Sequence, residues 1–244
     1  KNRGFFFCSD DKYTSYEDLY ELLKQKKKLF IKPFGAGKGT GVNQFQYING
    51  KPYIGIKRSA RKEIINYMRK NDDWMISECM QQHSYSSDLY DKTVNTIRLI
   101  TMRDIETQKI KIFFAVQRIG TSATIPVDNG SRGGLVSKID LETGELSEAR
   151  SLHSLEVHEV HPDSGAKIKG AVIPGWQDIK KEILALANKV SFMHFIAWDI
   201  LVTEEGICII EANTSSGVNI IQLWGGQRNK ELGDFYRYHK AIRK

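Results

Sequence analysis

The chain has 244 residues, of which 41% are hydrophobic and 27% charged, so it can bury a sizeable core and is not a small chain that needs disulfides to fold. No run of about 18 apolar residues is present and the basic N-terminus is not followed by an uninterrupted apolar region of signal-peptide length, so we expect a cytoplasmic protein without stable membrane insertion. The net charge of +7 favours anionic ligands such as nucleotides. The basic residues are scattered and show no aromatic–basic RNA motif, so we expect no nucleic-acid partner.

The first third of the chain alternates short apolar runs with turn signals. Leucines recur with helical spacing behind Ser15, which suits the N-cap position. Asn49-Gly50 between two strand-like runs is typical of a tight hairpin turn. In chain order the pattern predicts a helix over 16–25, a strand over 29–32, a hairpin of 42–48 and 53–56, a helix over 60–69 and a strand over 74–77. Together they predict a small α+β unit.

The remainder of the chain predicts a second and larger sheet. Its elements are expected to be strands over 94–101, 110–116 and 135–139, a polar loop over 128–134, a helix over 178–192, and strands over 195–202 and 207–211. The segment from Thr203 to Gly206 is rich in breakers and would join the last two strands as neighbours.

Four glycines and a lysine lie between Gly35 and Gly41. Glycine loops let backbone N–H groups approach phosphate oxygens, and Lys38 adds positive charge. A P-loop would need a glycine where Lys32 stands and a helix directly after the loop, whereas a hairpin is predicted there, so we reject that interpretation. Two interpretations stay open: a mobile flap over a triphosphate, with Lys32 on the preceding strand, and an exposed turn without a ligand.

Two apolar strands near the C-terminus each carry an acid, Asp199 and Glu211, and Asn213 follows on the second strand. The short turn between the strands would bring the three side chains to one end of a sheet. Mg²⁺ prefers hard oxygen ligands and usually takes one or two carboxylates together with substrate phosphates. The set therefore favours a Mg²⁺ site, whereas Asp199 alone would suggest a strand-end acid bonded to backbone N–H groups.

The order of these motifs resembles the ATP-grasp superfamily and, more narrowly, the sugar-transfer-associated ATP-grasp proteins, from about Phe30 to Gln222. The residues that carry the resemblance are Lys32-Pro33 with the glycine loop, Gln82-His83, Asn95-Thr96-Ile97-Arg98, Asp128-Asn129 with Gly133-Gly134, His161-Pro162, Pro174-Gly175-Trp176, Trp198-Asp199 and Glu211-Ala212-Asn213. It implies an α+β ATP-grasp fold in which two α/β lobes with antiparallel sheets sandwich ATP. Residues 1–80 would form the small lobe with the flap, and residues 81–244 the large lobe with the Mg²⁺ and acceptor sites.

The resemblance also implies roles for single residues. The implied catalytic residues, which would contact phosphate or the second substrate, are Lys32, Arg98, Arg118 and Arg132. The implied metal ligands are Asp199, Glu211 and Asn213. The implied nucleotide-binding residues are Lys32, Gly35, Gly37, Lys38, Gly39, Thr40, Glu78, Cys79, Met80, Gln81 and His83, with the stretch from Glu78 to Met80 offering backbone groups to adenine.

Several other residues are expected to be structural. The mechanism implied by the resemblance passes through an acyl phosphate, which is already activated, so His83, His158 and His161 are not needed as acids or bases. Trp74, Trp176 and Trp198 are expected to anchor the core. The three cysteines are far apart and lack metal-ligand spacing, which excludes a thiolate metal site and favours reduced side chains.

The resemblance implies an ADP-forming carboxylate–amine ligase that uses ATP and Mg²⁺ and acts through an acyl phosphate. Its partners would be small-molecule carboxylate and amine substrates, one of them a cell-surface polysaccharide or peptide precursor. Two alternatives stay open: a kinase that phosphorylates a hydroxyl, for which Asp128 is the only acid placed as a base, and a non-catalytic nucleotide-binding module. Ala197 stands where related ligases often carry an arginine, so Arg98, Arg118 or Arg132 would have to replace it. The chain also begins too late for the usual N-terminal domain, so we expect a missing domain, an oligomer or a minimal member.

Overall fold

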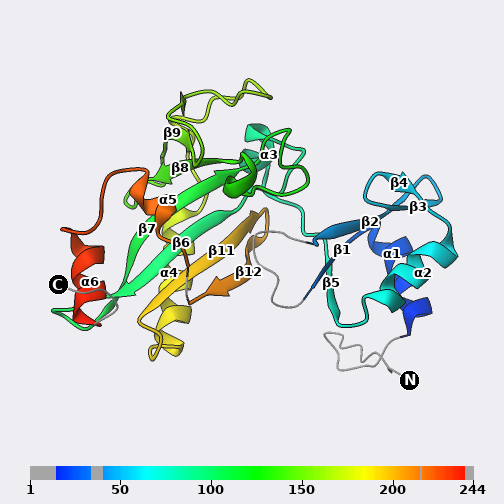
Figure 1. Cartoon of the computed structure of the whole chain (residues 1–244), viewed down its shortest axis with the longest axis horizontal. Coiled ribbons are helices and arrows are strands. Elements are labelled where there is room, and N and C mark those ends of the chain that lie inside the picture. The colour runs from blue at the N-terminus through cyan, green and yellow to red at the C-terminus, as the bar shows by residue number, and fades with distance from the viewer. Residues whose placement is uncertain (1–14, 34–40, 215, 240–244) are drawn as a thin grey trace. The chain divides into compact units, whose positions relative to one another are not determined.

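The computed structural model describes residues 15–33, 41–214 and 216–239. The chain forms two compact units, Lys1–Met80 and Gln81–Lys244. Each unit contains its own antiparallel sheet with helices packed against it (Figure 1). The fold class is therefore α+β, as the sequence predicts.

The first unit is a five-stranded sheet in the order β4-β3-β2-β1-β5. Its elements are α1 (Tyr16–Lys26), β1 (Lys28–Pro33), β2 (Asn43–Ile48), β3 (Lys51–Ile54), β4 (Lys57–Arg58), α2 (Arg61–Lys70) and β5 (Trp74–Glu78). Both predicted helices are confirmed, as are the strands predicted over 29–32 and 74–77, which are β1 and β5. Strand β4 is too short to show any period in the sequence.

Local signals explain where these elements begin and turn. Ser15 Oγ accepts a hydrogen bond from the Asp18 N–H at 3.1 Å, and the Asp18 carboxylate accepts one from the Ser15 N–H at 3.0 Å, so the two residues cap α1 reciprocally. Asn49 and Gly50 have φ angles of 49° and 75°, the left-handed pair that a two-residue hairpin turn requires. The predicted hairpin is confirmed, with its second strand beginning earlier than expected, at Lys51.

The core of the first unit lies between α1, α2 and one face of the sheet. Leu23 of α1, Ile64 of α2 and Ile31 of β1 are all completely buried. Because neighbouring residues of a strand point to opposite faces, Lys32 lies on the face of the sheet away from these helices.

The second unit is a seven-stranded sheet in the order β10-β9-β8-β7-β6-β11-β12. Its elements are α3 (Ser84–Leu89), β6 (Ile97–Arg103), β7 (Ile110–Ile119), a 3₁₀ helix (Gly130–Arg132), β8 (Leu135–Ile139), β9 (Leu146–Ser151), β10 (Val157–His158), α4 (Trp176–Lys189), β11 (Phe195–Thr203), β12 (Gly206–Asn213), α5 (Asn219–Gln222) and α6 (Glu231–Tyr238). No helix among the described residues is both long and apolar enough to cross a membrane.

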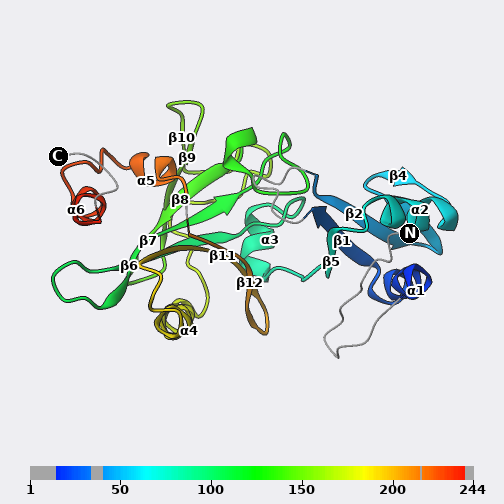
Figure 2. The ribbon, with the colours of Figure 1, turned by 60° about the horizontal axis from the view of Figure 1, so that its bottom comes forward.

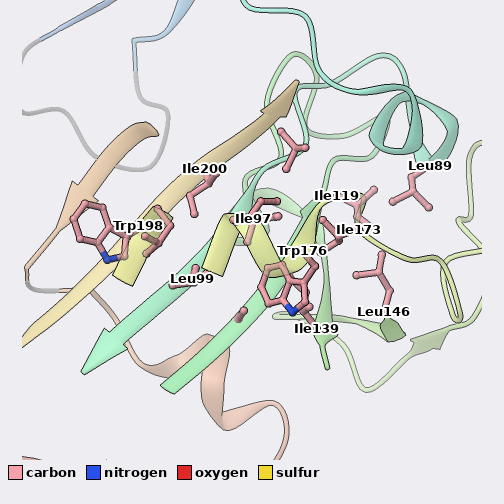
Figure 3. Close-up of a cluster of buried hydrophobic side chains, with 14 of the residues drawn as sticks. Leu89, Ile97, Leu99, Ile119, Ile139, Leu146, Ile173, Trp176, Trp198 and Ile200 are labelled. Carbon is pink, nitrogen blue, oxygen red and sulfur yellow. The ribbon is translucent and has the colours of Figure 1, made fainter. Parts of the chain in front are cut away.

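One face of this larger sheet packs against α4 through a layer of apolar side chains (Figure 3). Ile97 and Leu99 of β6 are completely buried there, and Trp198 of β11 is 6% exposed. Trp176, the first residue of α4, is 3% exposed and closes the layer from the helix side. Both tryptophans therefore anchor the core, as expected.

The opposite face of the same sheet is apolar at one end and charged at the other. Ile100 and Phe195 form the apolar end, which is covered by Ile220 of α5 and Phe235 of α6. Figure 2 shows α4 on one side of the sheet and α5 and α6 on the other. The charged end of this face holds the candidate site described below.

Strand β6 begins later than predicted, at Ile97, because side chains bind the two preceding backbone N–H groups. The Asn95 N–H donates to Gln82 Oε1 at 2.8 Å, and the Thr96 N–H donates to Asp128 Oδ2 at 2.7 Å. These side-chain acceptors take the place of a neighbouring strand. The helix α4 begins earlier than predicted, directly after a glycine in the left-handed conformation.

Candidate active site

Neighbouring strands bring charged residues together on the face of the large sheet opposite α4. Asp199 of β11 is the register partner of Arg98 on β6 and of Glu211 on β12. Directly opposed residues of antiparallel strands point to the same face. The structure therefore brings Arg98, Asp199 and Glu211 side by side.

A bulge in β12 makes this arrangement possible. From the turn onward the strands pair regularly up to Ile200 and Ile209, but the next pair is Asp199 and Glu211, so Ile210 is an extra residue. Without the bulge, Glu211 would lie opposite Trp198 and point toward α4. The extra residue turns the carboxylate to the charged face.

Arg98 and Asp199 form a two-pronged ion pair. Arg98 Nε donates to Asp199 Oδ1 and Arg98 Nη2 to Asp199 Oδ2, both at 2.8 Å. The two side chains are 20% and 6% exposed, so water has little access to the contact. A guanidinium that binds both carboxylate oxygens fixes the orientation of the pair as well as its charge. Within the described part of the chain, Arg98 has no other ion-pair partner.

Arg118 of β7 joins this ion pair to a second carboxylate. Its Nη2 lies 3.3 Å from Asp199 Oδ2 and 3.3 Å from Asp128 Oδ1. Its Nε donates to Thr96 Oγ1 at 3.0 Å. Burial alone would lower the pKa of Arg118, but the negative charges of Asp128, Asp199 and Glu211 outweigh it and raise the pKa above its usual value. Arg118 is therefore permanently charged and fixed by several partners.

Asp128 connects the loop before β8 to this network. Its Oδ2 accepts hydrogen bonds from the Thr96 N–H at 2.7 Å and from the Thr96 hydroxyl at 2.6 Å. Its Oδ1 faces Arg118, and the residue is only 5% exposed. Both oxygens are engaged, so the carboxylate serves as an anchor for the loop.

Glu211 and Asn213 complete the set of oxygen-bearing side chains that the sequence singled out. Glu211 is exposed, and its side chain has no hydrogen bond or ion pair with another described residue. Asn213 lies on the same face, opposite Ala197, and its Nδ2 is buried without a hydrogen-bond partner. An unpaired buried amide is costly, and rotation of the amide exchanges its oxygen for its nitrogen. Among the described residues, no group of three or more His, Cys, Asp or Glu side chains could hold a metal ion, so a cation here would depend on two carboxylates and an amide.

A buried asparagine supports the start of β6 behind the charged residues. Asn95 Nδ2 donates to the carbonyls of Ser86 at 3.0 Å and Tyr90 at 2.7 Å. Its Oδ1 accepts from the Thr93 hydroxyl at 2.6 Å and from the Gly120 N–H at 3.0 Å. Gly120 approaches so closely that a Cβ atom there would lie 2.3 Å from Thr93 Oγ1. The amide uses both of its donors and accepts two bonds, which fixes the segment that presents Thr96.

His161 has the structural role expected from the sequence. Its Nε2 lies 2.8 Å from the Gly120 carbonyl, while its Nδ1 faces the N–H groups of Asp163 and Ser164, each at 3.2 Å. These partners are consistent with a neutral ring that donates from Nε2 and accepts at Nδ1. Its ring also stacks on Tyr90 at a centroid distance of 4.7 Å.

The nucleotide-binding residues expected in the first unit are near the ends of two strands. Lys32 is half-buried on β1 and has no ion pair with a described residue. Glu78 ends β5 and pairs with Lys26 at 3.0 Å. Burial raises the pKa of the Cys79 thiol, so this cysteine is not an activated nucleophile. Met80 is 42% exposed.

The other predicted residues have varied positions. Gln81 is exposed, and His83 caps α3, where its Nδ1 accepts from the Tyr85 N–H at 3.2 Å. Arg132 is exposed in the 3₁₀ helix and does not contact Asp199, so Arg98 and Arg118 are the arginines that do. The flap residues Gly35, Gly37, Lys38, Gly39 and Thr40 lie outside the described residues.

The same face also carries an arginine to which the sequence assigns no role. Arg150 of β9 is separated from Arg118 by one strand, and its guanidinium lies 5.5 Å from the centre of the Trp224 ring. It donates to the Leu223 carbonyl at 2.6 Å and to Glu148 at 2.9 Å. The only signal for Arg150 in the sequence is Glu148, two residues before it. Charged residues at alternate positions are common on exposed strands, so this pattern does not indicate a functional site.

The chain matches the family model described as sugar-transfer associated ATP-grasp over residues 6–232. This chain belongs to the sugar-transfer associated ATP-grasp family. The resemblance stated from the sequence motifs is therefore confirmed, and the two antiparallel sheets are those of an ATP-grasp fold. No curated relative matches the chain.

Several solved ATP-grasp structures are similar to this ATP-grasp chain. A RiPP-associated ATP-grasp ligase from Chryseobacterium gregarium, in complex with ADP and a leader and core peptide, is 10% identical with a TM-score of 0.42, over 94% of this chain and 54% of that one. The ATP-grasp ligase PsnB with a phosphomimetic precursor variant, Mg and ADP is 10% identical with a TM-score of 0.42, over 83% and 43%. D-alanyl-alanine synthetase A from Vibrio cholerae O1 biovar eltor is 14% identical with a TM-score of 0.44, over 90% and 51%. The family member described here thus spans about half the length of these chains.

Proposed function

We propose that this ATP-grasp chain is an ADP-forming ligase that joins a carboxylate to an amine through an acyl phosphate. A carboxylate oxygen attacks the γ-phosphorus and ADP leaves; the amine nitrogen then attacks the acyl carbon, phosphate leaves and the nitrogen loses a proton. The observation that carries the proposal is the cluster of Arg98, Arg118, Asp199 and Glu211 on one face of the large sheet. It combines carboxylates that suit a divalent cation with guanidiniums that suit phosphate oxygens.

The donor set of this cluster fits Mg²⁺. Asp199 and Glu211 offer carboxylates from facing strands, and Asn213 beside them has a buried amide without a partner. Mg²⁺ usually keeps several waters and takes only one or two protein carboxylates together with substrate phosphates. Bound to these residues, it would offset the phosphate charge and polarise the γ-phosphoryl group.

The remaining roles follow from the family and stay predictions. Arg98 is assigned to the transferring phosphate and Lys32 to the other phosphates. The segment from Gly35 to Thr40 is assigned to a cover that excludes water from the acyl phosphate. Residues 78–83 are assigned to adenine and ribose, and Arg132 to the second substrate.

One residue supports the ligase over the kinase. A kinase generally needs a base beside the acceptor hydroxyl, and Asp128 is the acid that the sequence offers. Asp128 is buried, and its oxygens are occupied by Thr96 and Arg118. A carboxylate with these partners is an anchor and a poor proton acceptor.

The substrate proposed is a cell-surface polysaccharide or peptide precursor, and its support is the family's association with sugar transfer. The test screens a range of substrates and reports the chemistry at the same time.

The experiment is ADP and phosphate release from Mg-ATP across a panel of carboxylates, each with and without amines, with hydroxylamine added to trap acyl phosphate. We expect a hydroxamate with one carboxylate, and its loss in Glu211→Gln. The matched control is Glu205→Gln, which makes the same change at an exposed acid in the turn between β11 and β12. A phosphorylated product that does not react with hydroxylamine would establish the kinase, and ATP binding without turnover on any substrate would favour a binding role for this chain alone.

A further inference from the structure

Two arginines contact Asp199, but they are held in different ways. Arg98 uses both Nε and Nη2 on Asp199 and has no second ion-pair partner among the described residues. Arg118 contacts Asp199 at the longer distance of 3.3 Å and is also bound by Asp128 and Thr96. If Asp199 changed partners, Arg118 would keep its anchors and Arg98 would keep none.

The two carboxylates proposed for Mg²⁺ also differ in their hydrogen-bond partners. Each oxygen of Asp199 accepts one hydrogen bond from Arg98 at 2.8 Å, so the guanidinium occupies one side of the carboxylate. The Glu211 side chain has no such partner among the described residues and is exposed. A metal ion that approaches Asp199 from that side competes with the guanidinium for the same lone pairs, and two cations at one carboxylate repel each other, so metal binding at Asp199 favours movement of Arg98.

The geometry points to Arg98 as an exchangeable partner of Asp199 and to Arg118 as a fixed positioning residue, an inference that rests on the proposed function. In the nucleotide-free protein, Arg98 neutralises Asp199. When Mg²⁺ and nucleotide bind, Asp199 exchanges Arg98 for the metal, and Arg98 turns its freed guanidinium to the phosphates. Arg118 remains between Asp128 and Asp199 throughout and keeps the Asp199 carboxylate oriented.

This exchange makes the contribution of Arg98 to ATP binding depend on Mg²⁺. Without the metal, Asp199 holds the guanidinium, so Arg98 adds little to ATP affinity. With the metal, Asp199 is occupied and Arg98 is available. Arg98 and Arg118 can therefore be distinguished by whether their contribution to ATP affinity depends on Mg²⁺.

The first test measures the Kd of ATP in EDTA and in excess Mg²⁺ for the parent, Asp199→Asn and Glu211→Gln. Asp199→Asn releases Arg98, so we expect ATP affinity in EDTA to rise about ten-fold. Glu211→Gln removes the same charge from the facing strand but leaves the Arg98–Asp199 pair intact, so its affinity in EDTA should stay within about two-fold of the parent. An equal rise in both variants, or no rise in either, would overturn the exchange.

The second test uses Arg98→Gln and does not depend on the folding of Asp199→Asn. We expect this variant to lose about ten-fold in ATP affinity in Mg²⁺ and almost nothing in EDTA. An equal loss in both conditions would show that Arg98 contacts phosphate whether or not Asp199 is occupied, and would refute the proposal. If the parent binds ATP in neither condition, the proposed function itself fails, and that result is distinct from an altered Mg²⁺ dependence.

Discussion

The two faces of the seven-stranded sheet are built from the same strands and differ in what they contribute. In β6, Ile97 and Leu99 face α4 and are completely buried, while Arg98 between them faces the candidate site. In β11, Trp198 faces α4, and Asp199 faces the site. Because side chains alternate along a strand, one strand supplies core packing and site chemistry at adjacent positions. Substitutions of residues that face α4 should therefore mainly lower stability, and substitutions of their neighbours that face the site should mainly lower activity.

The largest expected effect is on the α4 face. Leu99→Ala should lower the free energy of unfolding by about 2–5 kcal/mol, since it removes buried methyl groups and leaves a cavity. Urea denaturation followed by tryptophan fluorescence measures the change. Leu155→Ala is the matched control, because Leu155 is fully exposed. A loss below about 1 kcal/mol for Leu99→Ala would break the comparison between the two faces.

A smaller effect is expected where the charged face is most buried. Arg118→Gln should cost about 2 kcal/mol, because it leaves the buried carboxylate of Asp128 without its ion-pair partner. The same denaturation assay gives the value. Arg132→Gln, at an exposed position, should change stability by less than about 0.5 kcal/mol. Equal values for the two variants would mean that Arg118 does not anchor the loop.

The exposed end of the charged face should affect chemistry and spare stability. Glu211→Gln should change the free energy of unfolding by no more than about 0.5 kcal/mol, because the exposed Glu211 side chain has no hydrogen bond or ion pair with a described residue. Its ATP turnover should fall at least about ten-fold, as expected for loss of a metal ligand. Parallel thermal melts and ADP-release assays check both parts. Unchanged turnover would remove Glu211 from the metal set.

The smallest expected effect lies on the sheet face opposite α4, at its apolar end, where His239 follows α6. Its ring packs on Phe235 and His194 at centroid distances of 4.5 and 4.9 Å. Burial first, and then the charges of His194 and Arg103, lower the pKa of His239 below its usual 6.5. The unfolded form therefore binds the proton more readily, so the docking of α6 is most stable above about pH 6.5 and weakens as the pH falls below it.

Limited proteolysis of the C-terminal segment at about pH 7.5 and about pH 5 measures this change, with faster cleavage expected at the lower pH. His239→Gln cannot titrate and should show a flatter pH dependence. Faster cleavage of the parent at the higher pH would contradict the sign of the effect.

Strong local signals made most of the fold predictable. The helix at Tyr16 has a capping serine, and the Asn49-Gly50 turn leaves few alternatives for a hairpin. The missed elements β4, β9, β10, α3, α5 and α6 are short or mostly polar, so their formation depends on contacts that no local period reveals. The late start of β6 likewise depends on Gln82 and Asp128, which are distant in the sequence.

The candidate site was predictable in its residue types and less so in its contacts. The sequence indicated Arg98, Asp199 and Glu211 through their motifs, but not that Arg98 holds both oxygens of Asp199. Nor did it indicate that Asp128 anchors Thr96 and Arg118, because those partners lie on separate elements. Pairing across strands fixes such contacts, and a single sequence gives the strands without their register.

The bulge at Ile210 has a consequence for how relatives of this chain are aligned and how they diverge. If β12 kept Ile210 but paired with β11 without the bulge, Glu211 would lie opposite Trp198 and point into the apolar layer under α4, whereas deletion of Ile210 would bring Glu211 directly after Ile209 and keep it opposite Asp199. Relatives that lack the extra residue must carry their acid one position nearer the turn to keep it beside Asp199. An alignment without gaps in this strand would therefore match Glu211 to a core-facing residue of such a relative. We expect a change in the length of this strand to occur together with a shift of the acid by one position.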